Sequence, residues 1–150
     1  RSIMNLKFGN LLNTLPQYDY VGITANSFVK NNGELVMGRG FARAMALKYP
    51  EIPSQAGYEI GLRQQYLVAP LPSQDHFTPF LFQVKIHWGD AANLGLVQKS
   101  TSFLAEFANA MAHYTFALNY PAIGNGRLSK DDVEPIITEL PDNVDIWQFK

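Results

Sequence analysis

The spacing of apolar residues along the chain predicts short strands that alternate with helices. Apolar runs at 5–8 and 20–25 predict strands, because β-branched and aromatic residues suit a pleated, half-buried surface. The Ala, Met and Leu content of 41–48 predicts a helix that follows a glycine-containing loop and ends before Pro50. Similar patterns predict helices over 54–62 and 129–140, and strands over 65–69, 79–86, 114–120 and 145–149.

The longest predicted helix spans 93–113. Its apolar positions recur at spacings of three and four, which gives one buried face. At the start of the helix over 129–140, Ser129 and Asp132 have the spacing of a capping box, and Leu128 with Val133 forms the matching hydrophobic staple. Strands alternating with helices predict an α/β sandwich in which helices cover a central sheet. The apolar face of the longest helix contains Val97, Thr101, Leu104, Phe107, Ala108 and Met111.

Composition and charge limit the class of protein. The 150 residues are 47% hydrophobic and carry a net charge of −1, which predicts one globular domain over 1–150 without an overall attraction to nucleic acid. The sequence has no cysteine, which excludes disulfides, thiolate metal sites and a cysteine nucleophile. It also shows neither a signal peptide nor a membrane span, so we expect a cytoplasmic protein with no membrane partner. Met4 is the expected natural start, after the remnant 1–3.

Three segments that follow predicted strands carry the candidate chemistry. They are Asn26 with the glycine loop beyond it, the segment 85–90, and the segment 124–128. Ligands of open α/β sheets bind at the carboxyl ends of the strands. We therefore expect the three segments to converge on one crevice.

Two glycine loops are candidates for phosphate binding. The loop from Gly33 to Gly40 precedes a helix, so its unobstructed N–H groups and the positive end of the helix dipole suit an anion. Gly124-Asn125-Gly126 offers a second such loop, and two loops together suit a diphosphate. Either loop by itself is also explained as a simple turn. Neither matches the dinucleotide or P-loop fingerprint.

Lys85 lies near the end of a predicted apolar strand. Partial loss of hydration there lowers the pKa of a lysine and makes its amine usable as a nucleophile or base. The alternative is a lysine whose stem lies along the sheet while its ammonium reaches water. His76, His87 and His113 lack metal-ligand spacing, so the sequence predicts no metal and no cofactor.

Four segments, taken in order, resemble the macrodomains, a superfamily of α/β/α modules that bind ADP-ribose. The segments are Gly9-Asn10, Ala25-Asn26-Ser27, 33–42 and 121–126, and the resemblance covers nearly the whole chain. It implies a three-layer α/β/α sandwich with a central mixed, mostly parallel sheet. It also implies that Asn26 contacts the distal ribose and that Asn10 stands where the family usually has an adenine-binding aspartate. The implied ligand-binding residues are Asn10, Leu11, Gly33, Val36, Met37, Gly38, Arg39, Gly40, Ile123, Gly124, Asn125, Gly126 and Arg127.

The segment 83–88 is similar to the lysine segment of macrodomains that reverse ADP-ribosylation on protein carboxylates or on DNA, including antitoxin partners of DNA ADP-ribosyltransferases. This resemblance implies that Lys85 is catalytic and acts at the anomeric carbon of the distal ribose, with Asn26 orienting that sugar. The glutamate-linkage hydrolases carry an aspartate soon after the second glycine loop, whereas this chain has no acid there until Asp131.

Three functions follow from this resemblance. The first is an ADP-ribosyl hydrolase that releases ADP-ribose from a modified protein or nucleic acid. The second is an ADP-ribose 1''-phosphate phosphatase, a branch that 40–50 also resembles. The third is a module that binds ADP-ribose without chemistry. Turnover by a Lys85→Ala variant separates the first from the third.

Overall fold

The computed structural model describes residues 5–149, and the expected start at Met4 lies outside them. Six strands form one sheet in the order β1-β6-β5-β2-β4-β3, in which every neighbouring pair is parallel except β3 with β4. The predicted mixed, mostly parallel sheet is therefore confirmed. The elements are β1 (Leu6–Phe8), the 3-10 helix η1 (Leu11–Gln17), β2 (Tyr20–Ala25), α1 (Gly40–Lys48), α2 (Ile52–Ile60), β3 (Val68–Pro70), β4 (Thr78–Gln83), α3 (Leu94–Ala110), β5 (Phe116–Asn119), α4 (Lys130–Ile137) and β6 (Val144–Gln148).

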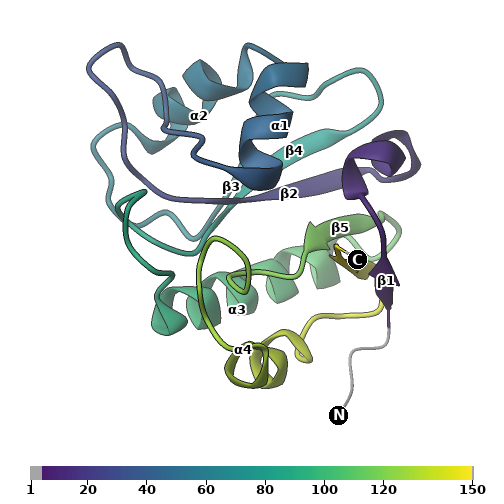
Figure 1. The fold of residues 1–150 in the computed structure, drawn as a ribbon. Coiled ribbons are helices and arrows are strands. Elements are labelled where there is room, and N and C mark those ends of the chain that lie inside the picture. Colours follow the sequence, from purple (N-terminus) through teal and green to yellow (C-terminus); the bar gives the residue numbers. More distant parts are fainter. Residues whose placement is uncertain (1–4, 150) are drawn as a thin grey trace.

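Helices cover both faces of the sheet and complete the predicted three layers. Figure 1 shows α1 and α2 on one side of the sheet and α3 and α4 on the other. Each side has its own apolar cluster: α1, α2 and η1 contribute to the first, and α3 and α4 contribute to the second. None of the helices within residues 5–149 combines the length and hydrophobicity needed to cross a bilayer.

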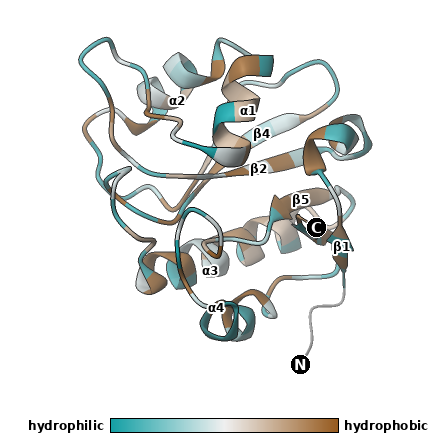
Figure 2. Ribbon diagram, in the orientation of Figure 1, coloured by the Kyte–Doolittle hydropathy of each residue, from teal (hydrophilic) through white to brown (hydrophobic). Residues whose placement is uncertain are grey.

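The central strand β2 is buried on both faces. Its residues Val21 and Ile23 belong to the first cluster, whereas the position between them, Gly22, faces Phe80 and Leu118 of the second. A Cβ at Gly22 would lie 2.6 Å from the Phe80 ring, so only glycine fits. Figure 2 shows hydrophobic segments along β2 and β5, as expected for strands covered on both sides.

The boundaries of the predicted strands 65–69 and 79–86 are wrong. Near these boundaries the buried side chain of Gln83, rather than the backbone of a neighbouring strand, bonds the backbone groups of 64–67. The Gln83 Oε1 atom accepts bonds from the backbone nitrogens of Tyr66 and Leu67 at 2.9 and 3.2 Å, and its Nε2 donates to the Gln64 carbonyl at 2.7 Å. This side chain takes the backbone groups that a longer β3 would have offered. As a result β4 ends at Gln83, and Lys85 lies in the turn beyond it.

Three smaller corrections concern helices. The sequence did not predict η1, which is capped by the Asn10 Oδ1 atom accepting from the Leu12 nitrogen at 3.0 Å. The helix predicted to reach residue 140 ends at Ile137. Ser129 caps α4 through a 3.1 Å bond from the Asp131 nitrogen, but no return bond from Asp132 forms in the described residues. Aspartate is one methylene shorter than the glutamate of a full capping box.

Candidate ligand-binding site

A cavity of about 1090 Å³ opens at the carboxyl ends of the parallel strands. Its volume lies just above the usual range for small-molecule sites, roughly 300–1,000 Å³. The three segments expected to converge, around Asn26, Lys85 and Gly124, all line it. The walls come from η1, β2, the loop into α1, the turn after β4, the loop after β5 and the end of β6.

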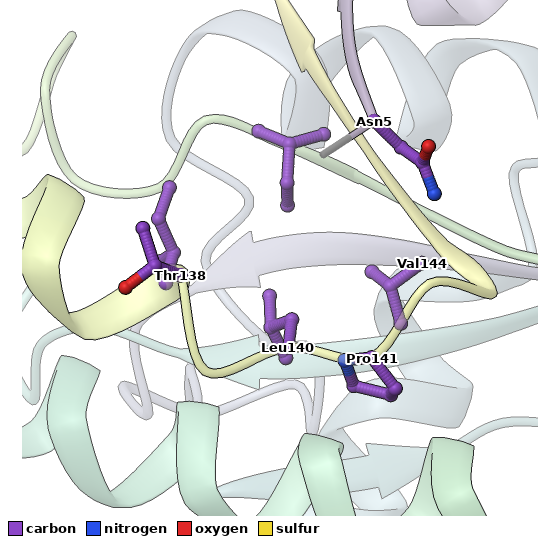
Figure 3. A pocket seen from close by; sticks show the side chains of 7 residues that line it. Asn5, Thr138, Leu140, Pro141 and Val144 are labelled. Atoms are coloured by element: carbon purple, nitrogen blue, oxygen red, sulfur yellow. The ribbon is translucent and has the colours of Figure 1, made fainter. Parts of the chain in front are cut away.

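A second hollow at the other end of β6 is too small for a ligand. Figure 3 shows Thr138, Leu140, Pro141 and Val144 closing around it, with Asn5 at one side. Its volume is about 10 Å³, which is no more than the space of one water molecule. The large cavity is therefore the better candidate site.

The first glycine loop presents backbone N–H groups to the cavity. Gly38 and Gly40 have φ angles of +64° and +65°, a left-handed conformation that favours glycine. Arg39, between them, is the N-cap of α1 and makes no side-chain capping bond. The N–H groups of the first turn of α1, at the positive end of its dipole, therefore remain available to an anion.

The second glycine loop is a tight turn that lies against the first. A Cβ at Gly40 would lie 3.1 Å from the Asn125 Nδ2 atom, which shows how closely the two loops approach. Ala122 and Arg127 have φ angles of +69° and +61°, uncommon for residues with a side chain. A Cβ at Gly126 would lie 2.6 Å from the Ala122 oxygen, so the turn depends on glycine there. The two loops together form a backbone-lined surface suited to a diphosphate.

Asn26 connects the end of β2 to the first glycine loop. Its side chain is 5% exposed, its Nδ2 donates to the Val36 carbonyl at 2.8 Å, and its Oδ1 accepts from the Phe28 nitrogen at 2.8 Å. These bonds use one of its two amide hydrogens and one of the two oxygen lone pairs. The second hydrogen and lone pair remain for a ligand in the cavity that Asn26 lines.

Lys85 lies in the turn after β4, on the cavity wall. Its Nζ donates to the carbonyls of Asp90 at 3.0 Å and Trp88 at 3.4 Å. A neutral amine has two hydrogens and one lone pair, so two carbonyl partners occupy the hydrogens and leave the lone pair free. The two bonds hold the amine in this turn, on the wall of the cavity.

The surroundings of Lys85 favour its neutral form. Burial lowers the pKa of the amine, and the guanidinium of Arg127, followed by that of Arg39, lowers it further through like-charge repulsion. The Asp90 carboxylate acts in the opposite direction, but the net pKa is below that of an ordinary lysine. This direction agrees with the partial loss of hydration that the sequence offers as one of two alternatives for Lys85. Arg39 and Arg127 lie in the two glycine loops, so both loops contribute to the lowered pKa of the Lys85 amine.

An aromatic wall forms the other end of the cavity, near Asn10. Trp147 lines the cavity, and its ring packs on the Gly9 backbone, since a Cβ there would lie 3.3 Å from it. The indole Nε1 donates to the Tyr18 hydroxyl at 2.9 Å, and this hydroxyl donates to the Asp145 carboxylate at 2.6 Å. Burial, and then the bond to Asp145, raise the pKa of Tyr18, which keeps the hydroxyl protonated. The network holds the Trp147 ring in one orientation.

Three residues expected in the site do not line the cavity. Leu11 is 1% exposed and belongs to the first apolar cluster. Gly33 lies against α2, where a Cβ on Gly57 would come within 1.8 Å of the Gly33 oxygen. Val36 contributes its carbonyl to Asn26 rather than to the cavity. The remaining expected residues do line it: Asn10, Asn26, Met37, Gly38, Arg39, Gly40, Lys85, Ile123, Gly124, Asn125, Gly126 and Arg127.

Sequence reasoning allowed that some aromatic residues face a nucleoside, but it did not identify which of them line the cavity. Trp88, Tyr120 and Trp147 border the cavity, although a general interpretation of aromatic residues assigns most of them to the core. The position of Tyr120 directly after β5 and of Trp147 near the end of β6 was the available signal. Burial, and then the Glu134 carboxylate, raise the pKa of Tyr120 to about 12, so its phenol is not a base at neutral pH.

Acidic residues are sparse around the site. Asp131 lies in the first turn of α4 and does not line the cavity. Asp90 is the carboxylate that acts on Lys85. Within residues 5–149 no group of three or more His, Asp or Glu side chains is arranged to hold a metal ion. The amine of Lys85 lines the same cavity, and its pKa is lowered.

Comparison with solved structures identifies the fold. The macrodomain of Thermus aquaticus DarG superimposes with a TM-score of 0.73 at 24% identity, covering 97% of both chains. That of Mycobacterium tuberculosis DarG gives 0.73 at 22% identity over 96% of both chains. Thermosipho africanus DarTG in complex with ADP-ribose gives 0.76 at 18% identity over 99% of this chain, which spans 43% of that protein.

The chain therefore has the macrodomain fold, as its sequence resemblance implies. Comparison of sequences assigns no family to the chain, since no protein-family model and no curated protein matches it.

Proposed function

We propose that this chain, with its macrodomain fold, binds ADP-ribose in the large cavity and hydrolyses ADP-ribosyl linkages to protein or nucleic acid. The observation that carries the proposal is that two glycine loops and the half-buried amine of Lys85 line one cavity of about 1090 Å³. The ligand is supported by the similar fold of Thermosipho africanus DarTG, whose structure is a complex with ADP-ribose.

The diphosphate would bind between the two glycine loops. The first turn of α1 supplies uncapped N–H groups, and the loop 121–127 supplies a second set from the opposite side. Donors fixed by the backbone lose little entropy on binding, and the helix dipole favours a negative charge. Arg39 and Arg127 add positive charge on either side of this clamp.

The two ends of ADP-ribose differ in the groups that meet them. The adenine would lie beside Asn10 and the fixed Trp147 ring, where an amide and an aromatic face replace the usual aspartate. The distal ribose would lie beside Asn26 and Lys85. This orientation places the anomeric carbon near the amine, and holding reactants in such a geometry contributes strongly to rate.

The amine acts at the anomeric carbon in one of two balanced ways. As a nucleophile, the Lys85 nitrogen forms a bond to the carbon while the bond to the acceptor breaks. The nitrogen then loses a proton, the departing acceptor gains one, and water releases ADP-ribose and restores the amine. As a base, the amine takes a proton from the water that attacks the same carbon while the bond to the acceptor breaks, and the ammonium that results gives its proton to the departing acceptor. Both routes require the neutral amine that the surroundings favour.

The test is a Lys85→Ala variant assayed on ADP-ribosylated peptide and oligonucleotide substrates. We expect turnover to fall by roughly 10²–10⁴-fold, the usual contribution of such a group, while calorimetry still detects ADP-ribose binding. Lys99→Ala is the matched control, because this lysine lies on α3, away from the cavity. Equal turnover by Lys85→Ala and the unmodified protein would remove Lys85 from the reaction.

Two other outcomes distinguish the remaining functions. Tight binding of ADP-ribose with every linked substrate unchanged after long incubation would indicate a binding module. Release of inorganic phosphate from ADP-ribose 1''-phosphate, without cleavage of peptide or oligonucleotide links, would indicate the phosphatase. Failure of ADP-ribose to bind at all would reject the proposed ligand.

A further inference from the structure

The side chain of Asn10 has a fixed orientation at the end of the cavity that Trp147 borders. Its Oδ1 atom accepts from the Leu12 nitrogen at 3.0 Å and so caps η1. A backbone N–H can only donate, so this bond determines which end of the amide is the oxygen. Within residues 5–149 the Asn10 Nδ2 atom has no hydrogen-bond partner, and Asn10 lines the cavity. Asn10 therefore meets a ligand chiefly as a donor, with two free hydrogens on its nitrogen.

Gln148, the last residue of β6, presents its amide in the same way. The Lys130 Nζ donates to the Gln148 Oε1 at 2.9 Å, and the same ammonium lies over the Tyr120 ring, 5.2 Å from its centroid. An ammonium has no acceptor, so the oxygen of Gln148 is fixed and its NH₂ group is the free end. Gln148 lines the cavity, and its carbonyl accepts from the Gly9 nitrogen at 3.0 Å, next to Asn10. We refer to Asn10 and Gln148 together as the amide pair.

The cavity offers no carboxylate to complement these donors. Among the described residues, no aspartate or glutamate lines it. Asp145 lies on the same strand as Gln148, but its carboxylate accepts from the Tyr18 hydroxyl at 2.6 Å and it is not part of the lining. A ligand group that donates at this end of the cavity therefore finds no anionic acceptor, whereas a group that accepts meets the amide pair.

Purine bases differ at position 6 in a way that the amide pair can distinguish. Adenine carries an amino group there, which donates, whereas hypoxanthine and guanine carry a carbonyl oxygen, which accepts. An asparagine or glutamine recognises adenine when its oxygen and its nitrogen are both free, because it accepts from the amino group and donates to N7. The oxygens of the amide pair are already bonded to Leu12 and Lys130. The carbonyl of a 6-oxopurine can instead accept directly from a free NH₂ group.

We propose that the amide pair selects the base of the ligand, and that the preferred base is a 6-oxopurine rather than adenine. The inference rests on the binding mode proposed above, in which the base lies beside Asn10 and the Trp147 ring. Stacking on an aromatic ring suits every base, so the polar contact at position 6 decides between them. The diphosphate and the distal ribose meet other groups, so the ligand remains a purine nucleoside diphosphate linked to ribose.

The test compares ADP-ribose with its hypoxanthine analogue, in which oxygen replaces the 6-amino group. Calorimetry with the unmodified protein should give a Kd that is roughly tenfold lower for the analogue, the selectivity of one good contact to a base edge. Asn10→Asp keeps an oxygen for the Leu12 nitrogen, and aspartate caps helices as well as asparagine does. Its second oxygen accepts where the amide donated, so the preference should reverse toward ADP-ribose. A purely structural role of Asn10 would change both Kd values by the same factor.

A second pair of variants tests Gln148. Lys130→Met releases the Gln148 oxygen, so the amide can turn and the ratio of the two Kd values should move toward one. Lys99→Met is the matched control, because this lysine lies on α3, away from the cavity, and the ratio should stay unchanged. Equal ratios in these two variants would remove Gln148 from the selection.

The outcomes separate base selection from the proposed function. Tighter binding of ADP-ribose by the unmodified protein, or a ratio of Kd values that Asn10→Asp leaves unchanged, would overturn the base selection while the hydrolase remains. Failure of both ligands to bind would reject the proposed function and the base selection together.

Discussion

The pKa of the Lys85 amine is lowered by neighbours that are distant in the sequence. Arg39 and Arg127 lie in different glycine loops, yet both lower the pKa of the amine, after burial as the largest cause. Asp90, in the same turn, raises it. The sequence could show a lysine after an apolar strand, but it could not show which charges surround the nitrogen. The tertiary fold therefore decides whether this amine is neutral and reactive.

The pH dependence of turnover tests these neighbours one at a time. If the neutral amine reacts, kcat rises with pH through the pKa of Lys85. Arg127→Gln removes a repelling cation, so that pKa rises and the ascending limb of the profile moves to higher pH. Asp90→Asn removes an attracting carboxylate, so the limb moves to lower pH. Profiles of kcat against pH for both variants check this, and shifts in the same direction would contradict it.

At the level of elements, local patterns predicted most of the fold. The strand predicted over 20–25 matches β2 residue for residue, and the loop, the helix α1 and the convergence of three segments are confirmed. The errors in element boundaries and in the missing helix η1 arose where contacts between residues far apart in the sequence decide the local structure. Gln83 ends β4 by bonding backbone groups near β3, and Leu11 is buried in η1, which the sequence did not predict. Neither contact can be recognised from the periodic spacing of apolar residues in the sequence.

The two glycines of the first loop give a matched test of its role. Gly33 and Gly38 both have positive φ, +89° and +64°, and a Cβ on either would meet no atom within 4 Å. Alanine at either position should therefore cost a similar amount of stability, about 1 kcal/mol from the left-handed conformation. Only Gly38 lines the cavity, so we expect Gly38→Ala to weaken ADP-ribose binding about tenfold and Gly33→Ala to leave it unchanged.

Denaturant unfolding measures the stability of both variants and calorimetry measures their affinity. Equal affinities in the two variants would show that the loop before α1 does not contact the diphosphate. A loss of affinity in Gly33→Ala alone would reverse the assignment that the structure gives to these glycines.

At the scale of the whole molecule, the cavity joins parts that are packed in different layers. The loop into α1 belongs with the first apolar cluster, whereas Tyr120, Ala122 and Ile123 contact the second, and all of them line the cavity. A ligand that fills the cavity would contact both sides of the sheet at once. Because it binds the folded chain and not the unfolded one, its binding is coupled to global stability.

The coupling predicts a thermal shift that depends on the diphosphate. At a concentration of about 100 times its Kd, ADP-ribose stabilises the native state by about 2.7 kcal/mol. For a domain of this size, that corresponds to an increase in Tm of roughly 5–10 °C. Adenosine, which lacks the diphosphate, should produce a smaller shift at the same concentration. Differential scanning calorimetry checks this, and equal shifts for the two ligands would argue against the diphosphate clamp.

The sequence contains two tryptophans, and both line the cavity. Trp147 packs on Gly9, next to Asn10, and Trp88, which is 53% exposed, accepts a hydrogen bond from Lys85 through its carbonyl. Tryptophan fluorescence of the unlabelled protein therefore originates from the wall of one cavity. Replacing either indole with phenylalanine turns the other into a single optical reporter, so occupancy of the cavity beside each indole can be followed separately and in real time.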